Sequence, residues 1–219
     1  MTSSNHNRHG GSAVDFALLA VVWAPLILGT LAIGTTMIRG LQTIQVARDT
    51  GHMYARGVDF SLSGNQSMVA WLGQELGMAT TGGKGVVILS TVSYVGRYQC
   101  QAAGVADNAT PPNPSAGCGN YQHFVFTHRI TIGNAALRAS NIGSPDASLV
   151  AGTGYITRDD YVKKSGARAD RFQLLEKPKE DGTDGFQAGQ FAYVVEAYFQ
   201  APPFPGFLAN PGTYADALF

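Results

Sequence analysis

The sequence predicts an α+β protein in which a long N-terminal membrane-spanning helix continues into a small antiparallel β-sheet domain with a loop-rich middle. The helix is predicted because no side chain from Phe16 to Ile38 is charged. A helix of about 23 residues is roughly 34 Å long, which is enough to cross the hydrocarbon core of a bilayer. The sheet is predicted because three later segments are β-branched or alternate between apolar and polar residues.

The N-terminal helix is expected to extend beyond the apolar run, as far as Phe60. Apolar or small residues recur there at steps of three and four, which is typical of one helix face. A helix from the start of the run through Phe60 would be about 47 residues and roughly 70 Å long. The residues of this face are Leu41, Ile44, Ala47, Gly51, Tyr54 and Val58.

Four further elements are predicted along the chain. Residues 66–78 form a short amphipathic helix, and residues 86–95, 122–132 and 191–199 form strands. In the second strand the alternation places four apolar side chains on one face, those of Phe124, Phe126, Ile130 and Ile132. The middle of the chain, 97–190, is loop-rich and shows no further pattern.

An acidic residue, Asp15, stands at the head of the apolar run. An ionised carboxylate costs about 2.5–3.5 kcal/mol at the centre of a bilayer and less near its surface, so Asp15 is expected to have a partner. A second interpretation places Asp15 at the headgroup level, where it caps the N-terminus of the helix. The two interpretations are compatible if one holds before assembly and the other after it.

The residues around Asp15 resemble the class III signal of type IV pilins and of their Tad relatives. TadE-like and TadG-like proteins typically have G-x-A-x-x-E-F-A-L at this place, and here Gly10 to Leu18 have the sequence GGSAVDFAL. A cut after Gly10 makes Gly11 the first residue, Asp15 the fifth and Phe16 the sixth. Asp replaces the usual Glu, which keeps the charge and shortens the side chain by one methylene.

This resemblance implies a function in filament assembly. A prepilin peptidase would cut between Gly10 and Gly11, and Asp15 and Phe16 would take part in packing between subunits. In pilins the fifth-position carboxylate is thought to pair with the N-terminal amine of a neighbouring subunit. The implied partners are therefore other pilin subunits, the prepilin peptidase and the pilus assembly platform in the bacterial inner membrane.

The same resemblance implies three parts of the chain: a leader peptide at 1–10, a transmembrane and filament-core helix at 11–38, and an extracytoplasmic α+β domain at 39–219. The C-terminal domain would then lie in the periplasm or outside the cell. Charge counting favours the opposite orientation, because Arg39, Arg48 and Arg56 follow the apolar run whereas Arg8 precedes it. The resemblance and the cysteines both favour the exported orientation.

The chain has two cysteines, Cys100 and Cys118. A disulfide between them would close a loop of about 19 residues and stabilise the fold by roughly 3 kcal/mol, which suits an oxidising compartment. The alternative is a pair of free thiols in a cytosolic loop. Two cysteines at this spacing do not make a zinc site, which needs four close ligands.

No motif predicts a catalytic site, a metal or a cofactor. The G-x-S-x-G and H-E-x-x-H patterns are missing from the sequence. His128 is expected to be a hydrogen-bonded core or edge histidine, and His123, on the opposite strand face, cannot share a metal with it. The net charge of zero gives no general attraction to nucleic acid. The alternative functions are a single-pass anchored periplasmic domain that binds a partner without polymerising and, third, an anchored hydrolase.

Overall fold

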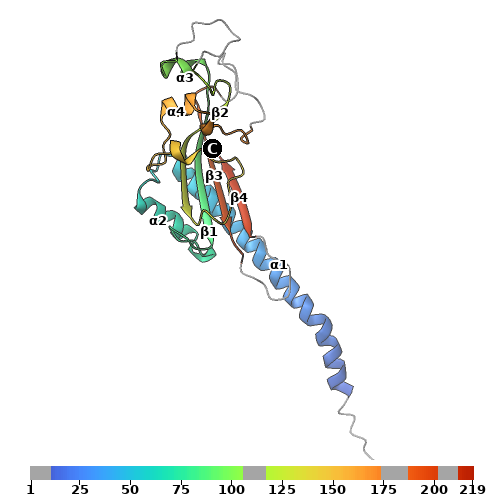
Figure 1. The fold of residues 1–219 in the computed structure, drawn as a ribbon. Coiled ribbons are helices and arrows are strands. Elements are labelled where there is room, and N and C mark those ends of the chain that lie inside the picture. The colour runs from blue at the N-terminus through green and yellow to red at the C-terminus, as the bar shows by residue number, and fades with distance from the viewer. Residues whose placement is uncertain (1–10, 106–116, 174–186, 202–211) are drawn as a thin grey trace, which may run out of the picture. The chain divides into compact units, whose positions relative to one another are not determined.

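The computed structural model describes residues 11–105, 117–173, 187–201 and 212–219. The chain divides into two compact units, Met1–Arg39 and Gly40–Phe219, which are described separately below. Helix α1 (Gly11–Ala55) contributes residues to both units (Figure 1). A long apolar helix followed by a small antiparallel sheet gives the predicted α+β class.

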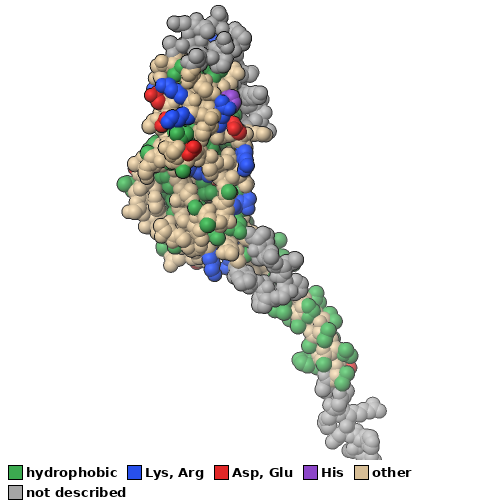
Figure 2. All heavy atoms as spheres, in the orientation of Figure 1, with side chains coloured by type: hydrophobic (Ala, Val, Ile, Leu, Met, Phe, Trp, Pro, Cys, Tyr) green, Lys and Arg blue, Asp and Glu red, His purple; other side chains and the backbone are tan. Residues whose placement is uncertain are grey.

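The part of α1 in the first unit is long and apolar enough to cross a membrane, and none of its most apolar stretch is buried. Hydrophobic side chains are exposed along the described part of this unit (Figure 2). Among the described residues of this unit, the hydroxyls of Thr30, Thr35 and Thr36 donate to carbonyls three or four residues earlier at 2.8–3.0 Å. These hydroxyls need no external partner, which suits a segment surrounded by hydrocarbon.

Helix α1 ends at Ala55, before the predicted end at Phe60. Gly57 has φ 85°, in the left-handed region. The amide of Gly57 donates to the carbonyl of Tyr54 at 3.0 Å, and the amide of Val58 donates to that of Met53 at 3.1 Å. This pair of bonds is a Schellman motif, which closes a helix at a glycine. The chain then turns and inserts Phe60, fully buried, into the core.

The buried face of α1 in the second unit is rotated from the predicted one. Leu41 is 63 % exposed and Ile44 is 45 % exposed, so the helix face predicted from spacing is only in part the buried one. The residues packed inward are Thr43, Val46, Ala47, Thr50, Gly51 and Tyr54. The spacing of residues along α1 does not distinguish between two overlapping helix faces. Contact with the sheet buries the face that contains the polar threonines.

The sheet has four antiparallel strands in the order β2-β1-β3-β4 (Figure 1). The strands are β1 (Gly85–Tyr94), β2 (Phe124–Gly133), β3 (Phe191–Phe199) and β4 (Thr213–Leu218). The first three confirm the predicted strands to within a few end residues. The fourth was not predicted, because it is short and its sequence, TYADAL, lacks a strong apolar alternation.

A β-bulge interrupts β2. Thr91 pairs with His128 and Val92 pairs with Phe126, so Thr127 is the extra residue. Ile130 and Ile132 therefore pack in the cluster that contains α1 residues, whereas Phe126 packs in a second cluster with Ala192. The prediction that all four apolar side chains of this strand share one face was wrong. An inserted residue reverses the alternation without any change of residue type.

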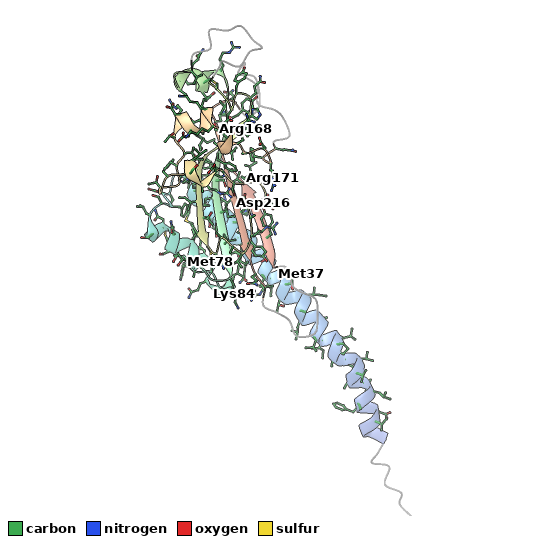
Figure 3. All side chains as sticks on the ribbon, viewed as in Figure 1. Met37, Met78, Lys84, Arg168, Arg171 and Asp216 are labelled. Atoms are coloured by element: carbon green, nitrogen blue, oxygen red, sulfur yellow. A yellow bond between two sulfur atoms is a disulfide. The ribbon has the colours of Figure 1, made fainter. Side chains whose placement is uncertain are left out.

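The other elements are short. Helix α2 (Ser63–Leu72) and the turn η1 (Gln74–Leu76) replace the single helix predicted over 66–78, because Gly73 ends α2. Val69 and Leu76 are buried, whereas Met68 is 44 % exposed. Before β1, Met78 forms an isolated antiparallel bridge with Gly83. Met78 and Lys84 are labelled in Figure 3. The remaining elements are α3 (Arg97–Ala102), η2 (Ala147–Leu149), α4 (Arg158–Lys163) and η3 (Ser165–Ala167).

Candidate functional site

The predicted assembly site lies at the start of α1. Gly10 lies outside the described residues, and α1 begins at Gly11. Asp15 is the fifth residue of the helix and is exposed. It therefore lies inside the helix, beyond its first turn, instead of at the capping position. Phe16 is 74 % exposed.

The predicted disulfide is present and joins Cys100 of α3 to Cys118. Both residues are buried in a small cluster with Val95, Val125 and Val162. The disulfide therefore links the segment that follows β1 to the segment that leads into β2.

A pocket of about 350 Å³ lies in the second unit, where the end of α1 meets the bulge in the sheet. This volume is within the usual range for small-molecule sites. Thr91 and Thr127 line it at the bulge, and Gly57, Val58 and Asp59 form part of its rim. Its aromatic and imidazole walls come from Tyr54, His128, Tyr155, Tyr161, Phe191 and Tyr193.

Four of these rings form a continuous row. The centroids of Tyr155 and His128 are 4.2 Å apart, and those of His128 and Tyr54 are 5.7 Å apart. Tyr193 meets Tyr54 edge to face, with centroids 5.3 Å apart and an interplanar angle of 84°. Such edge-to-face pairs hold rings in fixed orientations. The pocket therefore has two rigid walls roughly at right angles.

Hydrogen bonds hold the centre of this row. The Nε2 atom of His128 lies 3.1 Å from the carbonyl of Thr153, and its Nδ1 atom lies 2.5 Å from the hydroxyl of Tyr54. The carbonyl accepts only, so Nε2 carries the proton and Nδ1 accepts from Tyr54. The Tyr54 oxygen in turn lies 2.7 Å from the hydroxyl of Thr91, which donates to it.

The electrostatics of the pocket follow from burial and from these bonds. Burial lowers the pKa of the His128 imidazole and raises the pKa of the Tyr54 phenol. Both groups are therefore neutral at pH 7. Hydrogen bonds from the side chain and amide of Ser61 lower the pKa of the exposed Asp59 carboxyl. Asp59 is therefore ionised, and it is the charged residue on the pocket wall among the described lining residues.

A second polar cluster lies on the other face of the sheet. Glu196 of β3 is buried and accepts from the hydroxyl of Ser140, from the amide of Asn141 at 2.6 Å and from the hydroxyl of Tyr214 at 3.0 Å. The guanidinium of Arg138 lies 4.1 Å from the ring centroid of Tyr214. These bonds hold the segment after β2 against the sheet.

Arg129 belongs to the same face. It donates to the hydroxyl of Ser90 at 2.6 Å and to the carbonyl of Gly143 at 3.1 Å. Burial lowers the pKa of Arg129 to about 10, and the nearby Glu196 partly opposes this shift. Arg129 remains charged at pH 7, and its bonds assign it to the support of a loop.

Hydrogen bonds hold both nitrogens of the His128 ring. His128 therefore confirms the prediction of a hydrogen-bonded core histidine. Within the described ranges, no three His, Cys, Asp or Glu side chains are grouped so as to hold a metal ion. The described lining of the pocket combines ring surfaces, tyrosine and threonine hydroxyls and one carboxylate.

Sequence reasoning missed this pocket. Tyr54 was assigned to a helix stripe and Tyr193 to a strand face, and both assignments describe backbone position alone. The rings come from α1, β2, β3 and the segment after η2, and only tertiary pairing joins them. The signals available were the aromatic residues Phe191 and Tyr193 of β3 and the histidine of β2, two strands that β1 separates.

No family model matches the chain, and no curated protein or solved structure is detectably similar to it.

Proposed function

We propose that the protein is a structural subunit, of the minor pilin or pseudopilin type, of a Tad or type IV-like filament. The observation that carries this proposal is the nature of α1. Its first part presents apolar side chains without burying them, and the same helix then supplies residues to the core of an antiparallel sheet domain. A helix of this kind can exchange lipid for neighbouring helices without refolding.

Asp15 fits this proposal through its charge and position. It is exposed on the helix and lies four residues from Gly11, the start of the chain after the proposed cut. A carboxylate and an amine that are each costly in lipid become tolerable when they are paired. The pairing of Asp15 with the terminal amine of a neighbour would also set the axial offset between subunits.

The disulfide supports the exported orientation in this proposal. Cystine bridges persist in oxidising compartments such as the bacterial periplasm, and they are rare in the cytosol. Cys100 and Cys118 both belong to the second unit. The chain would thus be anchored in the inner membrane with residues 39–219 in the periplasm, and it would act with other pilin subunits, the prepilin peptidase and the assembly platform.

The aromatic pocket favours a second candidate function. A single-pass anchored domain that binds a ligand and never polymerises would need such a pocket, whereas a purely structural subunit would not. This candidate has no need of a cut between Gly10 and Gly11.

Proteolytic processing separates the two functions. The first experiment is the intact mass and N-terminal sequence of the protein recovered from membranes and from sheared surface material of its own host. A start at Gly11 with the apolar run retained supports the filament function. An intact Met1, or a start beyond residue 30, contradicts it.

A pair of variants sharpens this experiment. Gly10→Val places a side chain next to the proposed cut and is expected to leave the leader attached. Gly29→Val is the control, because nothing lies within 4 Å of a Cβ at Gly29, and it is expected to be processed normally. Normal processing of Gly10→Val would contradict the proposed cleavage site.

A further inference from the structure

The pocket at the bulge has three properties that together restrict what it can bind. The first is the arrangement of its rings. Tyr193 stands nearly perpendicular to Tyr54, and His128 and Tyr155 extend the second wall. Tyr155 is 58 % exposed and Phe191 is 52 % exposed, so rings also stand at the mouth of the pocket. A group that enters meets aromatic surface from two directions.

The second property is that the polar groups at the centre of the pocket are already paired. The hydroxyl of Tyr54 bonds to His128 and Thr91, the Nε2 atom of His128 bonds to the carbonyl of Thr153, and the hydroxyl of Thr127 donates to the carbonyl of Thr91 at 3.2 Å. A sugar or another polyhydroxyl ligand needs unpaired donors and acceptors that converge on it. These central groups do not supply them.

The third property is the sign of the charge. Among the described lining residues there is no lysine or arginine, and His128 is neutral. Asp59 supplies a negative charge at the rim, and its position is set by the Gly57 turn. Its carboxylate accepts from the amide of Ser61 at 2.8 Å, and its carbonyl accepts from the side chain of Asn65 at 2.7 Å. The charge is therefore held in place before any ligand arrives.

We propose that this pocket binds a quaternary ammonium group. The electron-rich faces of tyrosine and phenylalanine attract such a cation, and Asp59 adds a direct charge interaction. A methylated ammonium is favoured over a primary amine because it is less strongly hydrated and has an apolar surface that fits against rings. The proposal is independent of filament assembly, since every residue in it belongs to the second unit.

The test is a titration of the full chain in dodecyl maltoside micelles with choline, followed by saturation-transfer NMR and calorimetry. The matched ligand is 3,3-dimethyl-1-butanol, which has the shape of choline without its charge. We expect choline to bind about tenfold more tightly than the neutral alcohol, because cation–π and charge interactions add to the shared apolar contact. Equal affinities, or no choline binding up to about 50 mM, which would leave less than about 2 kcal/mol of binding free energy, would overturn the proposal.

Three variants test the chemistry of the site. Tyr155→Leu removes an exposed ring and is expected to weaken choline binding about fivefold, whereas Tyr155→Phe keeps the ring and should bind as the parent does. Asp59→Asn keeps an oxygen acceptor for Ser61 and is expected to weaken binding about threefold to tenfold. The control is Tyr98→Leu, which removes a 75 % exposed ring outside the pocket and should leave binding unchanged.

Two further outcomes would reassign the pocket. If Tyr155→Phe weakens choline binding as much as Tyr155→Leu does, the pocket recognises its ligand through the Tyr155 hydroxyl, and the proposal of a cation site is overturned. Binding of methyl glucoside in the absence of any choline binding would also overturn the proposal. A final titration of choline in nanodiscs distinguishes a soluble ligand from a lipid headgroup. Weaker apparent choline binding in phosphatidylcholine nanodiscs than in phosphatidylglycerol nanodiscs would show that the lipid headgroup competes for the pocket. Equal choline binding in the two kinds of nanodisc would indicate a soluble ligand. Either result in the nanodiscs supports the cation site.

Discussion

The two parts of helix α1 meet their surroundings in opposite ways. Up to Arg39 the helix presents valine, leucine, isoleucine and tryptophan side chains that remain exposed, and its hydroxyls bond within the helix. From Gly40 onward six inward residues are buried, and Thr43 bonds to Thr213, which is far away in the chain, at 2.6 Å. One helix thus combines a part whose apolar side chains are exposed with a part whose inward side chains belong to the core of the second unit.

This comparison teaches that the hydrophobicity of a side chain does not by itself determine whether it is buried, because the surroundings of the helix also decide it. The apolar stretch in the first part of α1 is not buried, whereas the buried face of the second part includes Thr43, Thr50 and Gly51. In the first part the side chains suit a lipid environment, where exposed apolar surface carries no penalty. In the second part close packing against strands decides which side chains point inward.

Removal of an aromatic ring is expected to give the largest difference in the free energy of unfolding between the two parts of α1. Tyr54→Ala deletes a ring that is 5 % exposed together with its hydrogen bonds, and should lower the free energy of unfolding by about 3–5 kcal/mol. Phe16→Ala deletes a ring that is 74 % exposed and should leave that free energy unchanged. Urea unfolding in micelles, followed by circular dichroism, measures both. Equal effects would show that the comparison is wrong.

Loss of the disulfide is expected to have the next largest effect. Reduction of Cys100–Cys118 should lower the free energy of unfolding of the second unit by about 2–4 kcal/mol, because the unfolded chain regains the entropy of an open loop. The double variant Cys100→Ala with Cys118→Ala should match the reduced protein. The helical signal of the micelle-bound part should persist in both. A protein whose stability is unchanged by reductant would contradict this prediction.

A smaller effect separates two glycines of α1. A Cβ at Gly51 would collide with the ring of Phe219, so Gly51→Ala should lower the free energy of unfolding by about 1–3 kcal/mol. Nothing lies within 4 Å of a Cβ at Gly34, so Gly34→Ala should be neutral or slightly stabilising through helix propensity. Thermal unfolding of the two variants side by side provides the measurement, and a stable Gly51→Ala would require Phe219 to lie elsewhere.

The smallest expected effect is a pH dependence of the second unit. Burial lowers the pKa of His128 below its ordinary value of 6.5, so between the two values the unfolded chain binds more protons than the folded one. The free energy of unfolding should therefore fall as the pH falls through 6.5 towards the folded pKa. Asp59, which faces His128 and has a lowered pKa, acts in the same direction at lower pH.

The variant His128→Gln tests the source of this dependence. Glutamine keeps a donor and an acceptor and does not titrate, so the stability of the variant should change less between pH 7 and pH 5 than that of the parent. Unfolding measured at a series of pH values gives the two slopes. Identical slopes would assign the dependence to other groups.

Much of the fold was predictable because it depends on local patterns. The uncharged run, the three longer strands and the cysteine pair all follow from residue type and spacing, and the structure contains each of them. Three of the places where prediction failed each involve a single residue. Gly57 ended α1 early, Thr127 inserted a bulge into β2, and Gly73 shortened α2.

The sequence by itself determined that an apolar helix precedes a disulfide-bonded α+β domain, because periodicity and charge act over a few neighbouring residues. Only the tertiary structure decided which face of α1 is buried, that the chain's last residues form β4, and that Tyr54, His128, Tyr155 and Tyr193 form one pocket. These features depend on pairing between segments that are distant in the chain. Pairing is selected by the packing of the whole domain, and no local pattern carries it.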